Sequence, residues 1–210
     1  MGRFSSDSTY AGAPPDASLE LLGIEPLEDH ARRLAALLTV SARGQKSATH
    51  LKRLDAHMRS LRQVYVELTD DARRGEQRPP AAEWLLDNFH LISAAARDIR
   101  HDLPSSFHQR LPVVADDEFA GSPRVYAMAF ELIGHSAGRL DPQRLHRFVS
   151  AFQSITPLSM GELWAWPSAL KLALIDYVRA RADALATSRA HRVLADAIAA
   201  SARGDRNART

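Results

Sequence analysis

Helix-start signals recur along this chain, and no stretch alternates apolar and polar residues for long enough to make a strand. Pro26, Pro80, Pro123 and Pro142 each stand in the first turn of a segment whose apolar residues recur every three to four positions. Proline suits this place because its fixed φ matches a helix and its missing N–H needs no partner there. A spacing of three to four residues is the period of an α-helix. The sequence therefore predicts an all-α protein.

Seven or eight helices are expected, joined by short turns. The count depends on Pro167, which lies inside one apolar segment and is expected to kink that helix or split it in two. The other boundaries follow from glycines, prolines and capping residues. Among these are Ser122 and Asp141 as helix caps, and a capping box formed by Ser159 and Glu162. The predicted helices cover residues 25–40, 47–75, 79–103, 122–135, 141–155, 159–178 and 188–202.

Three parts follow from composition. Residues 1–17 are small, polar and proline-rich, which predicts a disordered segment. Residues 18–186 form one helical domain, and residues 187–210 form a basic helix and tail rich in Ala and Arg. The whole chain has a net charge of only +2, and the last 24 residues hold five Arg and two Asp. The basic excess thus belongs to the tail, which argues against a nucleic-acid-binding face on the body.

Other classes are disfavoured by what the 210 residues contain. There is no cysteine, which removes disulfides, thiolate nucleophiles and Cys-based zinc sites. No apolar run approaches the roughly 18 residues of a membrane-spanning helix. Neither a G-x-S-x-G nucleophile motif nor a glycine-rich phosphate loop is present. None of the nine histidines forms an H-E-x-x-H pair. No catalytic, cofactor-binding or metal-binding residue is predicted.

Several polar residues of the predicted helices could have a functional or a structural role. Glu83, Asp87 and His90 share one helix face and could hold a metal, but a solvated outer face is the favoured interpretation. Asn88 is expected on the apolar face, where its amide would fix a neighbouring loop or helix end. His135 ends a helix, where an imidazole suits the negative end of the helix dipole.

Two further residues stand at a helix start, and three are tryptophans. Arg124 and Tyr126 could meet an anion at the helix N-terminus, although a packing role is favoured. Trp84 is expected in the core, on the same stripe as Asn88. Trp164 is in register with Met160 and is expected to be buried. Trp166, two residues on, should then lie near the surface beside Pro167.

Four phrases occur in order: "PAAEWLLDNFHLI", "DLPSSFHQRLP", "AGSPRVYAMAFELIGHSAGRLDPQRLHRFVSAFQ" and "LSMGELWAWPSALKLALIDYVR". Together they resemble the N-terminal region of cyclic β-1,2-glucan synthases, which are very large bacterial inner-membrane proteins. The resemblance covers roughly residues 20–185. The sequence departs from the family at Ser122, where a tyrosine is usual, and in "HSAGRLD", which replaces a more polar phrase. Both changes weaken any binding role for that turn.

The resemblance implies a link to the synthesis of β-1,2-glucan from UDP-glucose on the cytoplasmic side of the inner membrane. The glycosyltransferase part, which would use UDP-glucose and a divalent metal, lies beyond this region of the family, so this chain alone is expected not to transfer glucose. Its partners would be the remaining domains of such a synthase, in cis or in trans. The family-motif residues that could serve in docking or binding are Trp84, Asn88, His90, Pro123, Arg124, Tyr126, His135, Glu162, Trp164 and Trp166.

Three functions remain open. In the first, the chain is a non-catalytic helical module of a cyclic β-1,2-glucan synthase, as a fragment or the product of a split gene. Alternatively, it is a separate helical scaffold or regulator that docks on a membrane glycosyltransferase. The third is a small binding protein for glucan or nucleotide. Tryptophans exposed at a groove would favour the third function, because sugars stack on aromatic faces, whereas buried tryptophans would favour the first two.

Overall fold

The computed structural model describes residues 21–41, 49–103, 111–115 and 119–207, and the expected disordered segment 1–17 lies outside them. These described residues form six helices and one two-stranded sheet, which confirms the all-α prediction. The helices are α1 (Ile24–Leu37), α2 (Thr49–Arg73), α3 (Pro80–Asp102), α5 (Arg124–His135), α6 (Pro142–Gln153) and α7 (Met160–Asn207). None of these helices is both long and apolar enough to cross a membrane.

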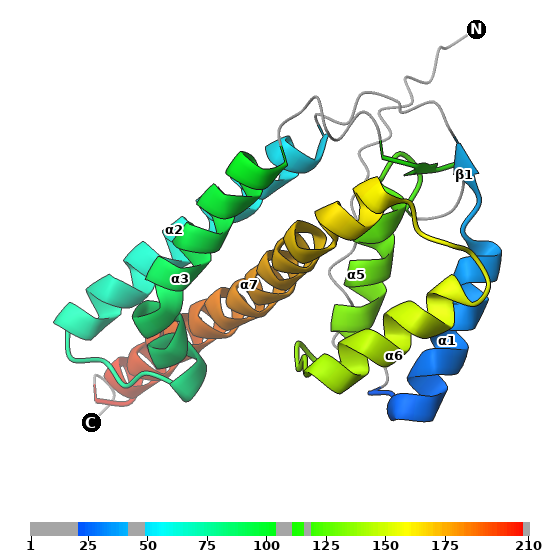
Figure 1. Cartoon of the computed structure of the whole chain (residues 1–210). Coiled ribbons are helices and arrows are strands. Elements are labelled where there is room, and N and C mark those ends of the chain that lie inside the picture. Colours follow the sequence, from blue (N-terminus) through cyan, green and yellow to red (C-terminus); the bar gives the residue numbers. More distant parts are fainter. Residues whose placement is uncertain (1–20, 42–48, 104–110, 116–118, 208–210) are drawn as a thin grey trace, which may run out of the picture.

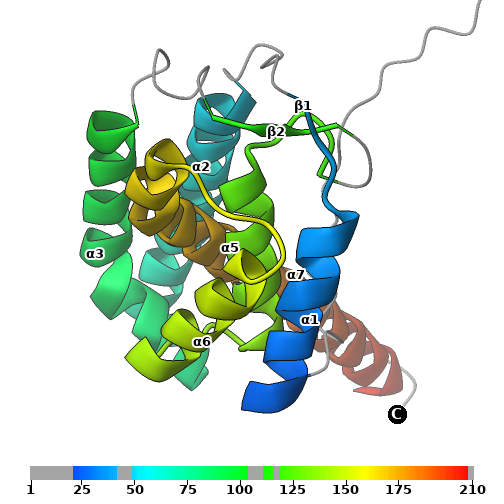
Figure 2. The ribbon, with the colours of Figure 1, turned by 45° about the vertical axis from the view of Figure 1, so that its right-hand side comes forward.

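The helices gather in two groups that share α5. Figure 1 shows α2, α3 and α7 running side by side, with α1, α5 and α6 together at the other side of the molecule. α5 packs along α7 and also contacts α1, and Figure 2 shows α7 crossing behind α5. α5 joins the two groups because apolar residues of both groups pack against it.

Each group has its own apolar core, and α5 contributes to both. Val125, Ala129 and Ile133 face the core made with α2, α3 and α7. Ala127, Met128 and Leu132 face the core made with α1 and α6, where Phe148 and Phe152 of α6 are completely buried. Nine of the 12 residues of α5 are buried, because both cores pack against this mostly apolar helix.

A short antiparallel ladder holds the start of α5. Strand β1 (Val40–Ser41) follows α1 and pairs with β2 (Val113–Val114), with Val40 opposite Val114. The chain then turns back, and the Arg124 amide donates to the Pro112 carbonyl at 2.9 Å. The residue at the N-cap of α5 is Pro123, and no side chain caps the helix, so the expected cap by Ser122 is wrong. These main-chain contacts take the place of a side-chain cap.

The helix α7, which is 48 residues long, is not split at Pro167, so that part of the prediction is also wrong. Pro167 lies on the solvent face of the helix, where water can take the hydrogen bond that the missing N–H leaves open. The helix also runs without interruption across residues 186 and 187, where the sequence suggested the start of a separate tail. Because these two predicted segments merge, the described part of the chain has six helices where the prediction was seven or eight.

The buried face of α3 is displaced from the predicted one, so the expected burial of Trp84 is wrong. Trp84 is 52% exposed and Leu91 is 56% exposed. The buried residues are Ala82, Leu85, Ile92, Ala96 and Ile99. Two apolar stripes run side by side on this helix. The one that faces inward includes two alanines, which let α3 approach α2 and α7 closely, and a tryptophan there would hold the helices apart.

The predicted order of burial for the two tryptophans of α7 is reversed. Trp164 is 76% exposed, and Met160, which set its expected register, is 70% exposed. Trp166 is half-buried and packs against both cores. The inward stripe of α7 begins with Glu162 and Ala165, because Glu162 has to meet Arg124 inside the protein.

Candidate functional site

Arg124 and Glu162 form an ion pair that is almost completely removed from solvent. Arg124 begins α5, and its Nε and Nη2 atoms donate to the two carboxylate oxygens of Glu162 at 2.8 Å each. The exposed fractions of the two side chains are 5% and 1%. The guanidinium also donates to the Pro157 carbonyl at 3.2 Å and lies over the Phe152 ring. The anion at this helix start is therefore Glu162 of the same chain, and Arg124 has the packing role favoured from the sequence.

The same carboxylate completes the predicted capping box of α7. Glu162 Oε2 accepts hydrogen bonds from the amide and the hydroxyl of Ser159, each at 2.8 Å. In return, the Ser159 hydroxyl accepts from the Glu162 amide at 3.3 Å. Glu162 thus caps its own helix and binds the first residue of another. Both oxygens of its carboxylate therefore accept hydrogen bonds from the same chain.

A second buried polar cluster surrounds Asp176, in the middle of α7. Tyr126 donates to Asp176 Oδ2 at 3.1 Å, and Arg53 of α2 donates to the same oxygen at 2.8 Å. Arg179 reaches the other oxygen at 3.4 Å. The Arg53 guanidinium lies over the Tyr126 ring at 5.6 Å. Three helices, α2, α5 and α7, therefore meet on one carboxylate, and Tyr126 is a structural part of this contact.

His57 lies at the edge of this cluster and is held neutral. Its Nε2 atom accepts a hydrogen bond from Arg53 Nε at 3.1 Å, so the ring proton is on Nδ1. The Nδ1 atom is buried without a hydrogen-bond partner among the described residues. Burial, together with the charges of Arg179 and Arg53, lowers the pKa of His57 from 6.5 to about 4, against the opposing effect of Asp176.

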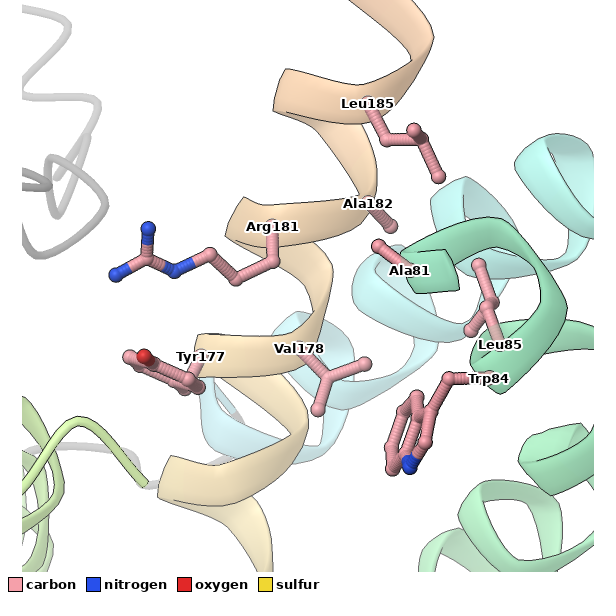
Figure 3. A pocket seen from close by; sticks show the side chains of 8 residues that line it. All are labelled: Ala81, Trp84, Leu85, Tyr177, Val178, Arg181, Ala182 and Leu185. Atoms are coloured by element: carbon pink, nitrogen blue, oxygen red, sulfur yellow. The ribbon is translucent and has the colours of Figure 1, made fainter. Parts of the chain in front are cut away.

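An open, mostly apolar groove runs between α3 and α7, with a volume of about 260 Å³. In Figure 3, Trp84 of α3 lies on one side of Val178, while Tyr177 and Arg181 lie on the other. The Arg181 guanidinium covers the Tyr177 ring at 5.0 Å from its centre. Of the two aromatic residues that line the groove, Trp84 is 52% exposed, whereas the Tyr177 ring is covered by Arg181.

Gly138 holds the outer side of Tyr177. This glycine has φ of +72°, and a Cβ atom there would lie 3.2 Å from Tyr177 Cε1. It ends α5 by donating from its amide to the Ile133 carbonyl at 3.0 Å. Only glycine meets both the backbone and the space requirement, so the "HSAGRLD" turn sets the position of the tyrosine.

His135 belongs to a third polar cluster, at the contact of α1 and α5. His30 Nε2 lies 2.7 Å from Glu131 Oε2, and His135 Nε2 lies 3.5 Å from the same oxygen. The two imidazole rings meet edge to face, with centres 4.4 Å apart. Burial raises the pKa of Glu131, but hydrogen bonds and charges from His135 and His30 outweigh it and lower the pKa to about 2.

The structure does not bring the remaining motif residues into one site. Asn88 donates to the Trp84 carbonyl of its own helix at 2.8 Å, so the expected contact with a neighbouring loop is wrong. His90 is exposed, and one ring nitrogen lies 3.0 Å from the Asp87 carbonyl. Glu83 and Asp87 are exposed, as the solvated-face interpretation predicted. Trp164 lies near the start of α7, away from the groove that Trp84 and Tyr177 line.

Several residues of these clusters were missed by sequence reasoning. Asp176 and His57 stand at buried positions of otherwise apolar helical stripes, three to four residues from Leu172 and Leu54. A charged residue at such a position signals a buried polar contact. Glu131 and His135 are four residues apart and so share a face of α5. No local signal pointed to His30, because its partners come from a helix about a hundred residues further along.

Comparison with known proteins gives a relationship for most of the chain. No family model matches it. The chain is 34% identical over 143 residues to a protein named cyclic beta-(1,2)-glucan synthase NdvB from Rhizobium meliloti (strain 1021). The match covers 67% of this chain and 5% of that relative. The chain is therefore related to a cyclic β-1,2-glucan synthase, of which it spans only a small part.

The Arg124–Glu162 pair gives a prediction for stability. Removal of one partner leaves the other as an unpaired buried charge, so Arg124→Met should lower the free energy of unfolding by about 3–5 kcal/mol. The double variant Arg124→Met/Glu162→Gln should lose less, because glutamine carries no charge. Arg147→Met, which breaks a more exposed contact with Glu28, should cost far less. Urea unfolding measures all three, and equal losses for the single and double variants would contradict the interpretation.

His57 gives a prediction for pH dependence. Its pKa is about 4 in the folded protein and near 6.5 in the unfolded chain, so the unfolded state binds more protons between these values. The free energy of unfolding should therefore fall as the pH is lowered from 6.5 to 4. His57→Leu should show a smaller fall, whereas His146→Leu, at an exposed position of α6, should behave as the wild type. Urea unfolding at several pH values tests this, and parallel curves for all three proteins would refute it.

Proposed function

We propose that this chain is a helical module of a cyclic β-1,2-glucan synthase, and that it docks on the catalytic part of that enzyme without performing chemistry itself. The main support is that polar and charged residues of the motif bind other residues of the same chain. Arg124 and Glu162 bind each other, and Tyr126 binds Asp176, so these groups hold the fold together. The relationship to NdvB supports the connection with glucan synthesis.

The proposed docking surface is the first turn of α7. Met160 and Trp164 are 70% and 76% exposed there, and Leu163 is 38% exposed. Large apolar side chains, tryptophan above all, are typical of the residues that contribute most to binding between proteins. The family phrase "LSMGELWAWPSALKLALIDYVR" contains these residues, which supports a partner within the same synthase.

The activity itself would belong to the partner. In this proposal the glycosyltransferase part binds UDP-glucose and a divalent metal, while this chain supplies neither a cofactor site nor a catalytic residue. The partner is joined to the module in the same polypeptide or binds it as a separate chain, as for a scaffold or regulator. The module would then lie at the cytoplasmic face of the bacterial inner membrane, held there by its partner.

A reconstitution experiment tests docking. Membranes would carry a cyclic β-1,2-glucan synthase from which the region matching this chain has been deleted, and purified chain would be added with radiolabelled UDP-glucose. The chain alone should incorporate no glucose above a heat-killed control, and its addition should restore glucan synthesis. Trp164→Ser should restore at least about tenfold less, because an exposed tryptophan can contribute 2 kcal/mol or more to an interface.

Two controls make that result specific. Trp84→Ser removes another exposed tryptophan and should restore synthesis as the wild type does. Both variants should keep the free energy of unfolding within about 0.5 kcal/mol of the wild type, as is usual for surface substitutions. Incorporation of glucose by the chain alone, or full restoration by Trp164→Ser, would rule out the proposal.

A second candidate function, glucan binding, is favoured by one observation. Trp84 is 52% exposed and lines the groove with Tyr177, which is the arrangement of tryptophan expected for a sugar-binding protein. A glucose ring would stack on the Trp84 ring, while Arg181 and the Tyr177 hydroxyl would bind sugar hydroxyls from the rim. The almost wholly apolar lining of the groove leaves few other polar partners for a sugar.

Titration with linear β-1,2-glucan oligosaccharides tests this second function. Calorimetry should detect binding by the wild type, and Trp84→Ala should weaken it at least about tenfold, since aromatic contacts of this kind contribute on the order of 1–2 kcal/mol. Trp164→Ala is the matched control and should bind normally. Absence of binding by the wild type would exclude a role of the groove in glucan binding and leave the docking proposal unaffected.

A further inference from the structure

Three potential metal ligands meet where α1 packs on α5. His30 comes from α1, and Glu131 and His135 come from successive turns of α5. One ligand atom from each residue can be chosen so that all lie within 4.8 Å of one another. We propose that His30, Glu131 and His135 form a binding site for a divalent transition-metal ion of the zinc class. This site is independent of the proposed docking function.

The ligand types fit this class of ion. Imidazole nitrogen suits zinc and its neighbours in the first transition row, and two histidines with one carboxylate is an established ligand set for zinc. A carboxylate is a ligand only when ionised. The imidazoles of His30 and His135 both lie beside this carboxylate, which favours its ionised form.

The distances also fit with small side-chain movements. Zinc–ligand bonds of about 2.0–2.1 Å in a tetrahedron place ligand atoms roughly 3.3 Å apart. His135 Nε2 already lies 3.5 Å from Glu131 Oε2. His30 Nε2 lies 2.7 Å from that oxygen, which is a hydrogen-bond distance. An ion bound there would replace this hydrogen bond, and the ligand atoms, which lie within 4.8 Å of one another, would close around it.

The surroundings leave room for a further ligand. The side chains of His30, Glu131 and His135 are 20%, 13% and 12% exposed, so the cluster is mostly enclosed but reached by solvent. A zinc ion bound by three protein ligands keeps a fourth position that a water molecule can occupy. The ion would also link α1 to the central helix α5 and so stabilise the fold in which it is bound.

Calorimetry with zinc chloride on the tag-free, EDTA-treated chain tests the site. We expect one zinc ion per chain in a strong binding event, and we expect His30→Gln and His135→Gln each to weaken it at least about a hundredfold. Glutamine is a suitable replacement because it can still donate a hydrogen bond to Glu131 without offering an imidazole nitrogen. Cobalt(II) substituted for zinc should show a visible absorption spectrum that changes in both variants.

Matched controls come from histidines elsewhere on the surface. His90→Gln and His146→Gln alter exposed histidines on α3 and α6 and should bind zinc as the wild type does. Zinc should raise the melting temperature of the wild type and of these controls but not of the site variants. Melting of each metal-free variant shows whether it is folded, and an unfolded one is set aside, since the other site variant carries the test. If zinc binds weakly and equally in all the proteins, the cluster is a hydrogen-bonded carboxylate–histidine contact and the proposal is wrong.

Discussion

The contact between Arg124 and Glu162 determines how the two helix groups meet. Arg124 is the first residue of α5 and Glu162 lies in the first turn of α7, so two parallel hydrogen bonds fix one helix start against the other. A planar guanidinium recognises a carboxylate in a definite orientation, which restrains rotation as well as distance. The rotation of α7 set in this way faces Ala165 inward and leaves Trp164 outside.

Two further acid–arginine contacts repeat this restraint along α7. Asp176 meets Arg53 of α2 near the middle of the helix, and Arg189 binds Asp71 at the end of α2. Buried ion pairs of this kind add little net stability, because desolvation offsets most of the attraction. They do penalise wrong arrangements strongly. A slide of α7 by one turn would leave several buried charges without partners, whereas apolar contacts alone would tolerate it more easily.

The period of the apolar residues was sufficient to predict the helices, and the capping residues predicted where α6 and α7 begin. Asp141 accepts from the Arg144 amide, and Ser159 and Glu162 form their capping box. Helix rotation was harder to predict, because α3 carries two neighbouring apolar stripes and only packing decides between them. The tryptophans were misplaced for this reason. Size and apolar character suggested burial, but the inward positions went to alanines that allow close helix contact.

The polar clusters show a different limit of sequence reasoning. His30 and Glu131 are 101 residues apart, and Arg53 and Asp176 are 123 apart. Their meeting depends on the folded arrangement of α1 on α5 and of α2 on α7, which no local pattern contains. What a single sequence can reveal is the unusual member of each set, such as the acid at position 176 within an apolar stripe. The partner becomes visible only in three dimensions.

The length of α7 has a mechanical consequence. Arg189 is the last residue of the helix with a described ion pair to the rest of the protein, and the described side chains from Ala190 onward are all exposed. The 18 residues from there to Asn207 extend about 27 Å at 1.5 Å per residue. A tilt of roughly 10° at the last anchor would carry the tip of so long a helix sideways by about 5 Å. The C-terminal part of α7 therefore extends as a long exposed helix beyond the ion pair between Asp71 and Arg189.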